Sequence, residues 1–140
     1  MSEYGRFIGI DVGTKRIGLA RSDLLRTIAS PIGTYGRDEI FDEIRKLVEK
    51  EQVLGFVVGW PLTPKGEEGK STEMVNKFIL QLEKRFPNLK IVKVDERYTS
   101  VKAVQSMVEA GVPKMKRRNR KRIDRAAAAI ILQTYLDQLK

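Results

Sequence analysis

The sequence predicts an α/β protein in which helices pack against a five-stranded mixed sheet. Three observations lead to this prediction. Apolar runs of strand length alternate with segments of helical periodicity after residue 38, a pattern that builds parallel sheets. Two further runs near the start are separated by only three residues with turn chemistry, which favours an antiparallel hairpin. The 140 residues suffice for one domain with its own core, so a single domain over 1–140 is expected.

The first third of the chain predicts three strands. Phe7–Val12 is a short apolar run, Gly13–Lys15 has turn chemistry, and Arg16–Ser22 alternates apolar and polar residues. A third strand is expected near Thr27–Tyr35. Pro31 interrupts it, and because proline lacks an N–H for the ladder, this strand is expected at the margin of the sheet.

The middle of the chain alternates helices and strands. Asp38 opens a segment whose apolar residues recur at helical spacing, and the next helix begins at Ser71 and is closed by Asn88. A third helix starts at Ser100 and stops at Gly111, with a proline two residues later. The strands expected between these helices are Gly55–Trp60 and Lys90–Val94.

The last part of the chain changes in composition. From Lys114 to Arg125, eight of twelve residues are Lys or Arg, and Ala126–Leu132 is apolar nearly all round. A helix of that kind packs against neighbours on several sides, and Asp124 is expected in its first turn. The whole order of elements suggests the ribonuclease H-like arrangement, with the five strands in the order 3-2-1-4-5.

Composition restricts the chemistry. The chain has 27 Lys+Arg, 18 Asp+Glu and a net charge of +9, which favours an anionic partner such as nucleic acid. It has no histidine and no cysteine, so disulfides, thiol nucleophiles and imidazole bases are excluded. Neither a signal peptide nor a membrane-spanning run is visible. We therefore expect a cytoplasmic protein without a membrane partner.

Carboxylates lie where strands end. Asp11 ends the first strand, Asp95 and Glu96 end the last, and Asp124 is the one acid in the basic segment. Ligands of open α/β sheets bind outside the carboxyl ends of the strands. The first and fifth strands are expected two spacings apart, roughly 10 Å, a gap that the longer Glu96 spans better than Asp95. Hard ions such as Mg²⁺ or Mn²⁺ prefer such ligands.

Each acid also has a simpler interpretation. Asp11 could form a turn with Gly13, and Asp95 or Glu96 could pair with Arg97. Asp124 could complement a helix dipole. Three acids together, in a chain without histidine, favour a metal site, and such a site hydrolyses phosphodiesters without a protein nucleophile.

Basic residues surround these acids. Such side chains position phosphates and carry no sequence information of their own. The side chains closest in sequence to the proposed metal site could hold the scissile phosphate, and the dense basic segment could dock the nucleic-acid backbone. The expected substrate contacts are Lys15, Arg16, Arg97, Thr99, Lys116, Arg117, Arg118, Arg120, Lys121 and Arg122.

Four motifs together resemble one known family. They are Gly9–Ala20, Val57–Leu62, Asp95–Ser100, and Asp124 with Ala127, Ala128 and Ile131–Gln133. In this order they resemble the YqgF family, also called RuvX, whose members are described as pre-16S rRNA nucleases. In contrast to the wider RuvC-like pattern, the fourth strand ends without an acid and the second carboxylate comes from the fifth.

The resemblance implies a function and a site. It implies a ribonuclease H-like nuclease, a hydrolase that matures the 5′ end of 16S rRNA in ribosome biogenesis. The family's acidic triad falls on Asp11, Glu96 and Asp124, with Asp95 as the alternative to Glu96, and the expected cofactor is Mg²⁺ or Mn²⁺. Structured RNA is the expected partner and branched DNA the alternative, for a monomer or weak homodimer.

Three other functions remain open at this point. A Holliday-junction resolvase would use the same charges on four-way DNA junctions. A non-catalytic RNA-binding factor in ribosome assembly would tolerate Asp11→Asn, whereas a metal nuclease would not. A phosphate-binding module of the actin and sugar-kinase type is suggested by Asp11–Thr14, but such proteins need a second domain that 140 residues cannot supply.

Overall fold

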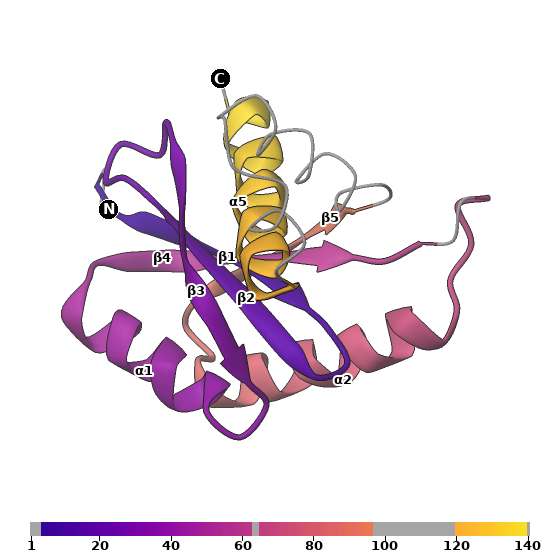
Figure 1. Cartoon of the computed structure of the whole chain (residues 1–140). Helices are drawn as coiled ribbons and strands as arrows, with labels where there is room; N and C mark the ends of the chain where they lie inside the picture. The colour runs from indigo at the N-terminus through magenta and orange to yellow at the C-terminus, as the bar shows by residue number, and fades with distance from the viewer. Residues whose placement is uncertain (1–3, 63–64, 97–119, 140) are drawn as a thin grey trace.

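The sheet has the predicted composition and order. The computed structural model describes residues 4–62, 65–96 and 120–139 (Figure 1). The five strands form one sheet in the order β3-β2-β1-β4-β5, which confirms the predicted fold class and strand order. The elements are β1 (Arg6–Val12), β2 (Arg16–Ser22), β3 (Ala29–Gly36), α1 (Ile40–Lys50), β4 (Val53–Trp60), α2 (Lys70–Arg85), β5 (Lys90–Asp95) and α5 (Arg120–Gln138).

The pairing of the strands places β1 at the centre. β1 and β2 form the predicted antiparallel hairpin, in which Asp11 lies opposite Gly18. β1 pairs in parallel with β4, and β4 in parallel with β5. β3 is an edge strand, as expected from its proline, and Pro31 lies opposite Ala20 next to a shift in the pairing register.

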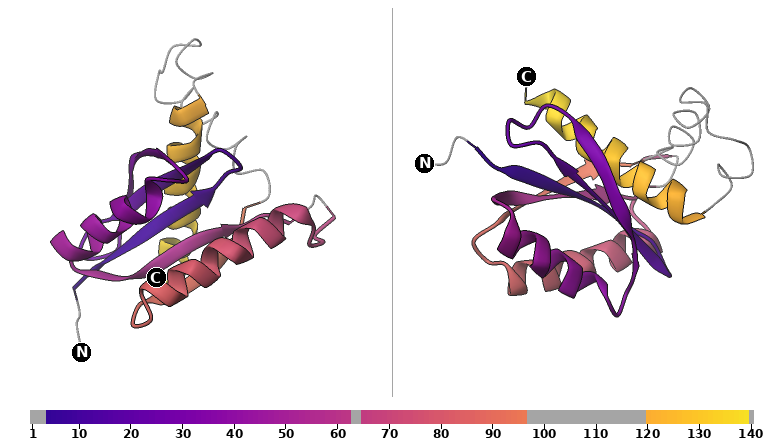
Figure 2. Two further views of the ribbon diagram at one scale, coloured as in Figure 1. Left: turned by 90° about the horizontal axis from the view of Figure 1, so that it is seen from below. Right: turned by 60° about the vertical axis from the view of Figure 1, so that its left-hand side comes forward.

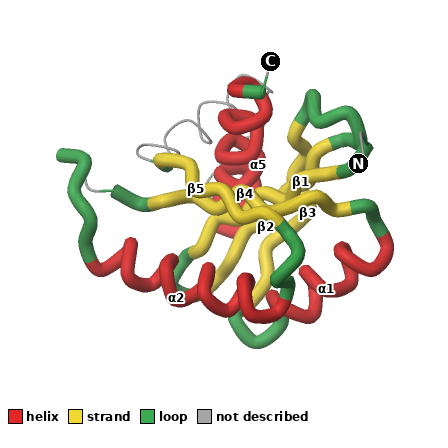
Figure 3. The backbone as a smooth tube through the Cα atoms, turned by 180° about the vertical axis from the view of Figure 1, so that it is seen from behind, coloured by secondary structure: helices red, strands yellow, loops and turns green. Residues whose placement is uncertain are grey.

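One face of the sheet is covered by α1 and α2. Because successive side chains of a strand point to opposite faces, Ile8, Ile10 and Val12 of β1 all contribute to the core on this side. The rings of Phe41 in α1 and Phe78 in α2 stack with their centroids 5.0 Å apart, which joins the two helices. Figure 3 shows these helices as one layer beneath the sheet.

Among the described residues, α5 is the helix that covers the other face. This helix crosses the sheet and contacts all five strands, and two further views show it on the side opposite α1 and α2 (Figure 2). A Cβ at Gly9 of β1 would lie 2.7 Å from Ala128 O and 2.7 Å from Leu132 Cβ. The helix therefore approaches β1 more closely than a larger residue at position 9 would allow, which explains its alanine-rich sequence.

Several element boundaries differ from the sequence prediction by a few residues. α2 ends at Arg85 rather than at Asn88, because Pro87 disfavours helical geometry at Phe86. α5 begins at Arg120, so Asp124 lies in the second turn and not in the first, where the helix dipole is strongest. The helix expected from Ser100 to Gly111 lies outside the described residues. In the ranges that the structure describes, no helix is both long and apolar enough to span a membrane.

Candidate functional site

Asp11 and Glu96 lie on the face of the sheet that α5 covers. Phe7 of β1 packs in the core under α5, so Asp11, four residues further along the strand, shares its face. Val94 of β5 packs in the same core, and Glu96 follows two residues later. The Glu96 amide donates a hydrogen bond of 3.1 Å to the carbonyl of Trp60, which extends the β4–β5 ladder to this residue.

A glycine between these two residues allows their carboxyl groups to meet. β4 separates β1 from β5, and Gly59 lies one residue beyond the pair formed by Ile10 and Val58. A Cβ at Gly59 would lie 2.6 Å from Glu96 Oε2 and 2.6 Å from Ile131 Cδ1. Glu96 therefore extends its side chain over Gly59 and shares a hydrogen bond with Asp11.

The two carboxyl groups disfavour each other's ionisation. Burial, followed by the negative charge of Asp11 and their hydrogen bond, raises the pKa of Glu96 to about 9, with a smaller contribution from Asp95. Two carboxylates this close cannot both ionise cheaply, so their contact favours the protonated form of Glu96. A divalent cation would compensate both charges and displace that proton.

The backbone of α5 brings position 124 to the same edge. Tyr135 packs edge-on against Phe7 with ring centroids 5.2 Å apart, while Ala128 lies over Gly9. Moving from Tyr135 back toward the start of α5 thus follows β1 toward Asp11. Asp124 is one turn before Ala128, about 5.4 Å, and Asp11 is two strand residues beyond Gly9, about 6.6 Å. From Ala128 toward position 124, α5 thus runs in the direction in which β1 runs from Gly9 to Asp11. The side chain of Asp124 is outside the described part.

Asp95 occupies a different position from Glu96. It is exposed and lies opposite Trp60 in the ladder, and Trp60 packs with the core on the α1/α2 side. Alternation thus places Asp95 on the face away from Asp11. Among the side chains that the structure describes, no group of three acids could hold a metal ion. A third ligand would have to come from a residue such as Asp124.

The β1–β2 turn holds two of the expected phosphate contacts next to the acids. Lys15 is exposed and Arg16 is half-buried. The Gly13 amide donates to Arg16 O at 2.9 Å, and a Cβ at Gly13 would lie 2.6 Å from the same oxygen, so the turn requires glycine. Arg37 fixes the turn from outside, because its Nε donates to Thr14 O at 2.7 Å and its Nη2 to Gly13 O at 2.8 Å.

Sequence reasoning did not find two of these features. Nothing in the sequence around Arg37 indicates that it binds the turn. Gly59 did carry a signal, because it occupies an α5-facing position of an apolar strand where a larger residue is expected. Of the other expected substrate contacts, Arg97, Thr99, Lys116, Arg117 and Arg118 lie outside the described residues. Arg120, Lys121 and Arg122 belong to the first turn of α5, and their side chains are not described.

The fold and the paired carboxyl groups together define a protein of the ribonuclease H-like class. A solved structure of "T. thermophilus RuvC in complex with Holliday junction substrate" shares this fold. It matches with a TM-score of 0.59 and 13% identity, covering 97% of this chain and 96% of RuvC. Residues 5–138 match the model of the RuvX family, described as "Holliday junction resolvase". The chain belongs to the RuvX family, which confirms the resemblance seen in its motifs.

Two relatives match this chain over nearly their whole length. A protein of Salinibacter ruber is 42% identical over 138 residues, 99% of this chain and 96% of the relative. A protein of Chlorobium chlorochromatii is 41% identical over 140 residues, the full length of both chains. Both carry the name "Putative pre-16S rRNA nuclease". These names support the predicted assignment of the chain to the nucleases, which are hydrolases.

Proposed function

We propose that this chain is a metal-dependent endonuclease that matures the 5′ end of pre-16S rRNA in the cytoplasm. The observation that carries the proposal is the hydrogen-bonded pair of Asp11 and Glu96 at the ends of β1 and β5. Two half-buried carboxyl groups in contact are unfavourable for stability alone. A cation bound by the pair would offset this cost.

The residues at this edge fit Mg²⁺ or Mn²⁺. Both ions prefer carboxylate oxygens, and the raised pKa of Glu96 reflects negative charge that a cation would neutralise. Asp11, Glu96 and Asp124 are the side chains that would hold the ion. When bound, such an ion activates a water for attack and neutralises charge that develops on the transferring phosphate.

The basic residues of the chain would position the substrate. Lys15 and Arg16 lie on the turn that follows Asp11 and would hold the phosphate next to the acids. The segment from Lys116 to Arg122 comes shortly before Asp124 in the sequence and would contact the backbone of the nucleic acid. These contacts recognise phosphate rather than base sequence, so the structure of the RNA would have to supply specificity.

The choice of RNA rests on the curated relatives. Both relatives described above carry a name that specifies pre-16S rRNA. The family description and the similarity to RuvC favour a second candidate, the resolution of four-way DNA junctions. Symmetric cleavage of a junction needs two active sites and therefore a dimer, whereas trimming of a leader needs one.

The test compares two labelled substrates, a pre-16S rRNA 5′ leader and a four-way DNA junction, in Mg²⁺ or Mn²⁺. We expect cleavage of the RNA. Asp11→Asn and Glu96→Gln should each reduce it at least about 100-fold, since a metal ion supplies several kcal/mol and 1.4 kcal/mol corresponds to tenfold.

The matched control is Asp95→Asn, which removes the neighbouring charge from the opposite face of the sheet. It should retain cleavage within about tenfold of the parent. Equal losses in Asp95→Asn and Glu96→Gln would contradict the assignment of the site. Cleavage of the junction alone would establish the resolvase, and tight binding of RNA with full tolerance of Asp11→Asn would favour the non-catalytic factor.

A further inference from the structure

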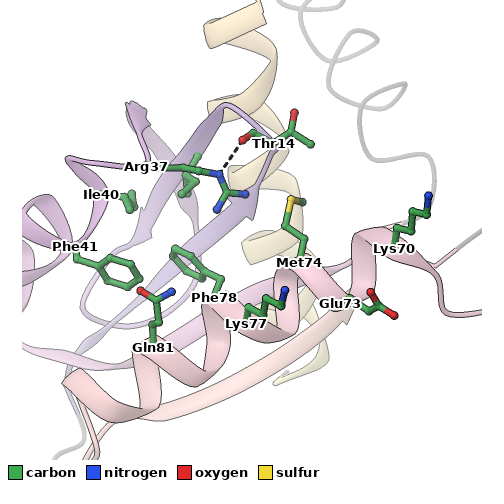
Figure 4. Close-up of a pocket in the computed structure, with 11 residues that line it drawn as sticks. Thr14, Arg37, Ile40, Phe41, Lys70, Glu73, Met74, Lys77, Phe78 and Gln81 are labelled. Atoms are coloured by element: carbon green, nitrogen blue, oxygen red, sulfur yellow. Dashed lines mark hydrogen bonds between the residues drawn. The ribbon is translucent and has the colours of Figure 1, made fainter.

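A hollow lies on the sheet face opposite α5, between the β1–β2 turn and α2. Its volume is about 510 Å³ (Figure 4). Ile17, Ile40 and Phe78 are buried beneath it, and Phe41 and Met74 are partly exposed in its wall. Sites for small ligands typically measure about 300–1,000 Å³ and have apolar walls with a few polar groups. The hollow is therefore large enough for one nucleotide.

Positive charge dominates the rim of this hollow. Arg37, Lys70 and Lys77 line it together with a single acid, Glu73, and all four are exposed. Figure 4 shows Arg37 entering from the β3–α1 side and Lys77 from α2 on the other. The Arg37 guanidinium is already oriented by its two bonds to the turn, so little conformational freedom is lost when it contacts a ligand. The rim is suited to an anion.

A neighbouring hollow provides a contrast. It measures about 250 Å³ and is lined by Trp60, Glu68, Glu73 and Lys93, among others. Two acids face one cation there, and the Lys93 ammonium already lies 4.0 Å from the centroid of the Trp60 ring. This second hollow does not favour an anion. The cationic rim therefore distinguishes the larger hollow from this neighbour.

The larger hollow is close to the candidate active site. Thr14 lines it and follows Asp11 by three residues, which span at most about 11 Å even when fully extended. The exposed Lys15 lies on the same turn. A nucleic-acid strand that leaves the acid pair can thus cross the end of the sheet over this turn and reach the rim.

We propose that this hollow binds a nucleotide of the RNA strand that flanks the cleaved bond. Its phosphate would contact Lys70, Lys77 and the free N–H groups of Arg37, and its sugar and base would lie against Met74 and Phe41. The identity of the ligand rests on the proposed nuclease function. The position of the contact is inferred from the positive charge of the rim. It is also inferred from the β1–β2 turn, which lines the hollow and follows Asp11 in the chain.

The test measures RNA binding by fluorescence anisotropy in EDTA over a series of salt concentrations. Lys70→Ala/Lys77→Ala is compared with Lys50→Ala/Lys84→Ala, which removes one exposed lysine from α1 and one from α2, both outside the hollow. Each phosphate contact to a single strand contributes about 0.7 to the slope of log K against log salt. Because both lysines contact the same phosphate, the rim variant should lose about 0.7, so its affinity deficit should shrink about 2.6-fold between 50 and 200 mM salt. The control should keep the parent slope.

A length series locates the contact. RNAs are shortened from either end toward the cleavage position. Removal of the flanking nucleotides from one of the two ends should abolish the difference in RNA affinity between the rim variant and the parent. Removal of nucleotides from the other end should leave that difference unchanged. Circular dichroism should show native folding of both variants, because all four lysines are exposed.

Three results would overturn the inference. The first is an equal loss of RNA affinity in the rim and control variants, and the second is an affinity deficit of the rim variant that persists with RNAs truncated on both sides. The third is parent-like RNA binding by the rim variant together with binding of free adenosine monophosphate to the parent. The last would identify a small-molecule site. If the parent binds with the expected slope and length dependence but cleaves no RNA, this contact stands and the proposed nuclease function fails.

Discussion

The two faces of the central sheet are built from different residues. On the face toward α5, Gly9 lies in β1 and Gly59 lies in β4. The helix packs against this face with small residues such as Ala128. Toward α1 and α2 the same strands present large apolar side chains, among them Phe56, which is fully buried. Alternation along a strand thus lets one face supply most of the packing while the other accommodates two carboxyl groups and a closely packed helix.

The largest expected effect is on the bulky face. Phe56→Ala removes a fully buried ring that packs against Phe86 with centroids 5.5 Å apart. We expect the free energy of unfolding to fall by about 3–5 kcal/mol, as measured by urea denaturation. The kcat of the folded fraction should be unchanged. A comparable loss of kcat in folded protein would show that the two faces are not independent.

On the face toward α5, a substitution is expected to change the free energy of unfolding less and to lower the rate of cleavage directly. Gly59→Ala places a methyl group 2.6 Å from Glu96 Oε2 and should displace that carboxylate from Asp11. Cleavage by folded protein should fall about 100-fold, equivalent to about 2.7 kcal/mol.

The matched control is Gly55→Ala on the same strand and face. Its Cβ would lie 2.5 Å from Lys90 O, far from the acids, so it should destabilise the protein and retain kcat. A similar loss of kcat in both variants would indicate general distortion of β4 rather than displacement of Glu96.

The pH dependence of stability sharpens the same comparison. In the folded protein the pKa of Glu96 is raised to about 9 from an ordinary value of 4.5. Between these values the folded state binds more protons than the unfolded state. The stabilisation from this group is therefore complete below pH 4.5 and is lost as the pH rises through about 9, by up to about 1.4 kcal/mol per pH unit.

This dependence can be isolated by substitution. Urea unfolding in EDTA from roughly pH 6 to 8 should show the parent losing stability with pH relative to Glu96→Gln. If the free energies of unfolding of the two proteins change in parallel with pH, Glu96 does not retain this proton in the folded state. Mg²⁺ should stabilise the parent more strongly at the higher pH, because binding has to displace that proton.

The smallest effect is expected where the faces meet, at the β1–β2 turn. Arg37→Lys cannot reproduce the two-pronged contact with Gly13 O and Thr14 O. Cleavage should fall by about tenfold or less, with kcat lowered through the turn and KM raised through the proposed phosphate contact, since one exposed hydrogen bond contributes about 1 kcal/mol. Arg45→Lys, which keeps its exposed pairing with acids on α1, should leave both constants unchanged.

Much of this architecture is predictable from the sequence, because the signals are local. The hairpin follows from Gly13–Lys15 between two apolar runs, and the edge position of β3 follows from Pro31. The convergence of Asp11 with the end of β5 follows from the rule that ligands bind where parallel strands end. Each inference requires only a short window of residues and a general property of sheets.

The remaining features depend on contacts between distant segments. The fourth strand lacks an acid, which looked like a departure from the RuvC-like pattern, but its Gly59 supplies the space in which Glu96 reaches Asp11. The role of Arg37 depends on a turn more than twenty residues earlier in the chain. The sequence shows a small residue at position 59 but not which side chain occupies the space, and nothing in the sequence around Arg37 indicates its contact with the turn.

The covering helix also has a consequence for the order of events during synthesis. α5 follows every strand in the chain, and its Gln133 accepts a hydrogen bond of 2.9 Å from the amide of Ala29, 104 residues earlier. Contacts between such distant residues form slowly, because a long loop must first be closed. The acid-bearing edge is therefore completed only after the ribosome has made α5. A nascent chain that still lacks α5 has the strands that carry Asp11 and Glu96 but not the helix that packs on their face of the sheet.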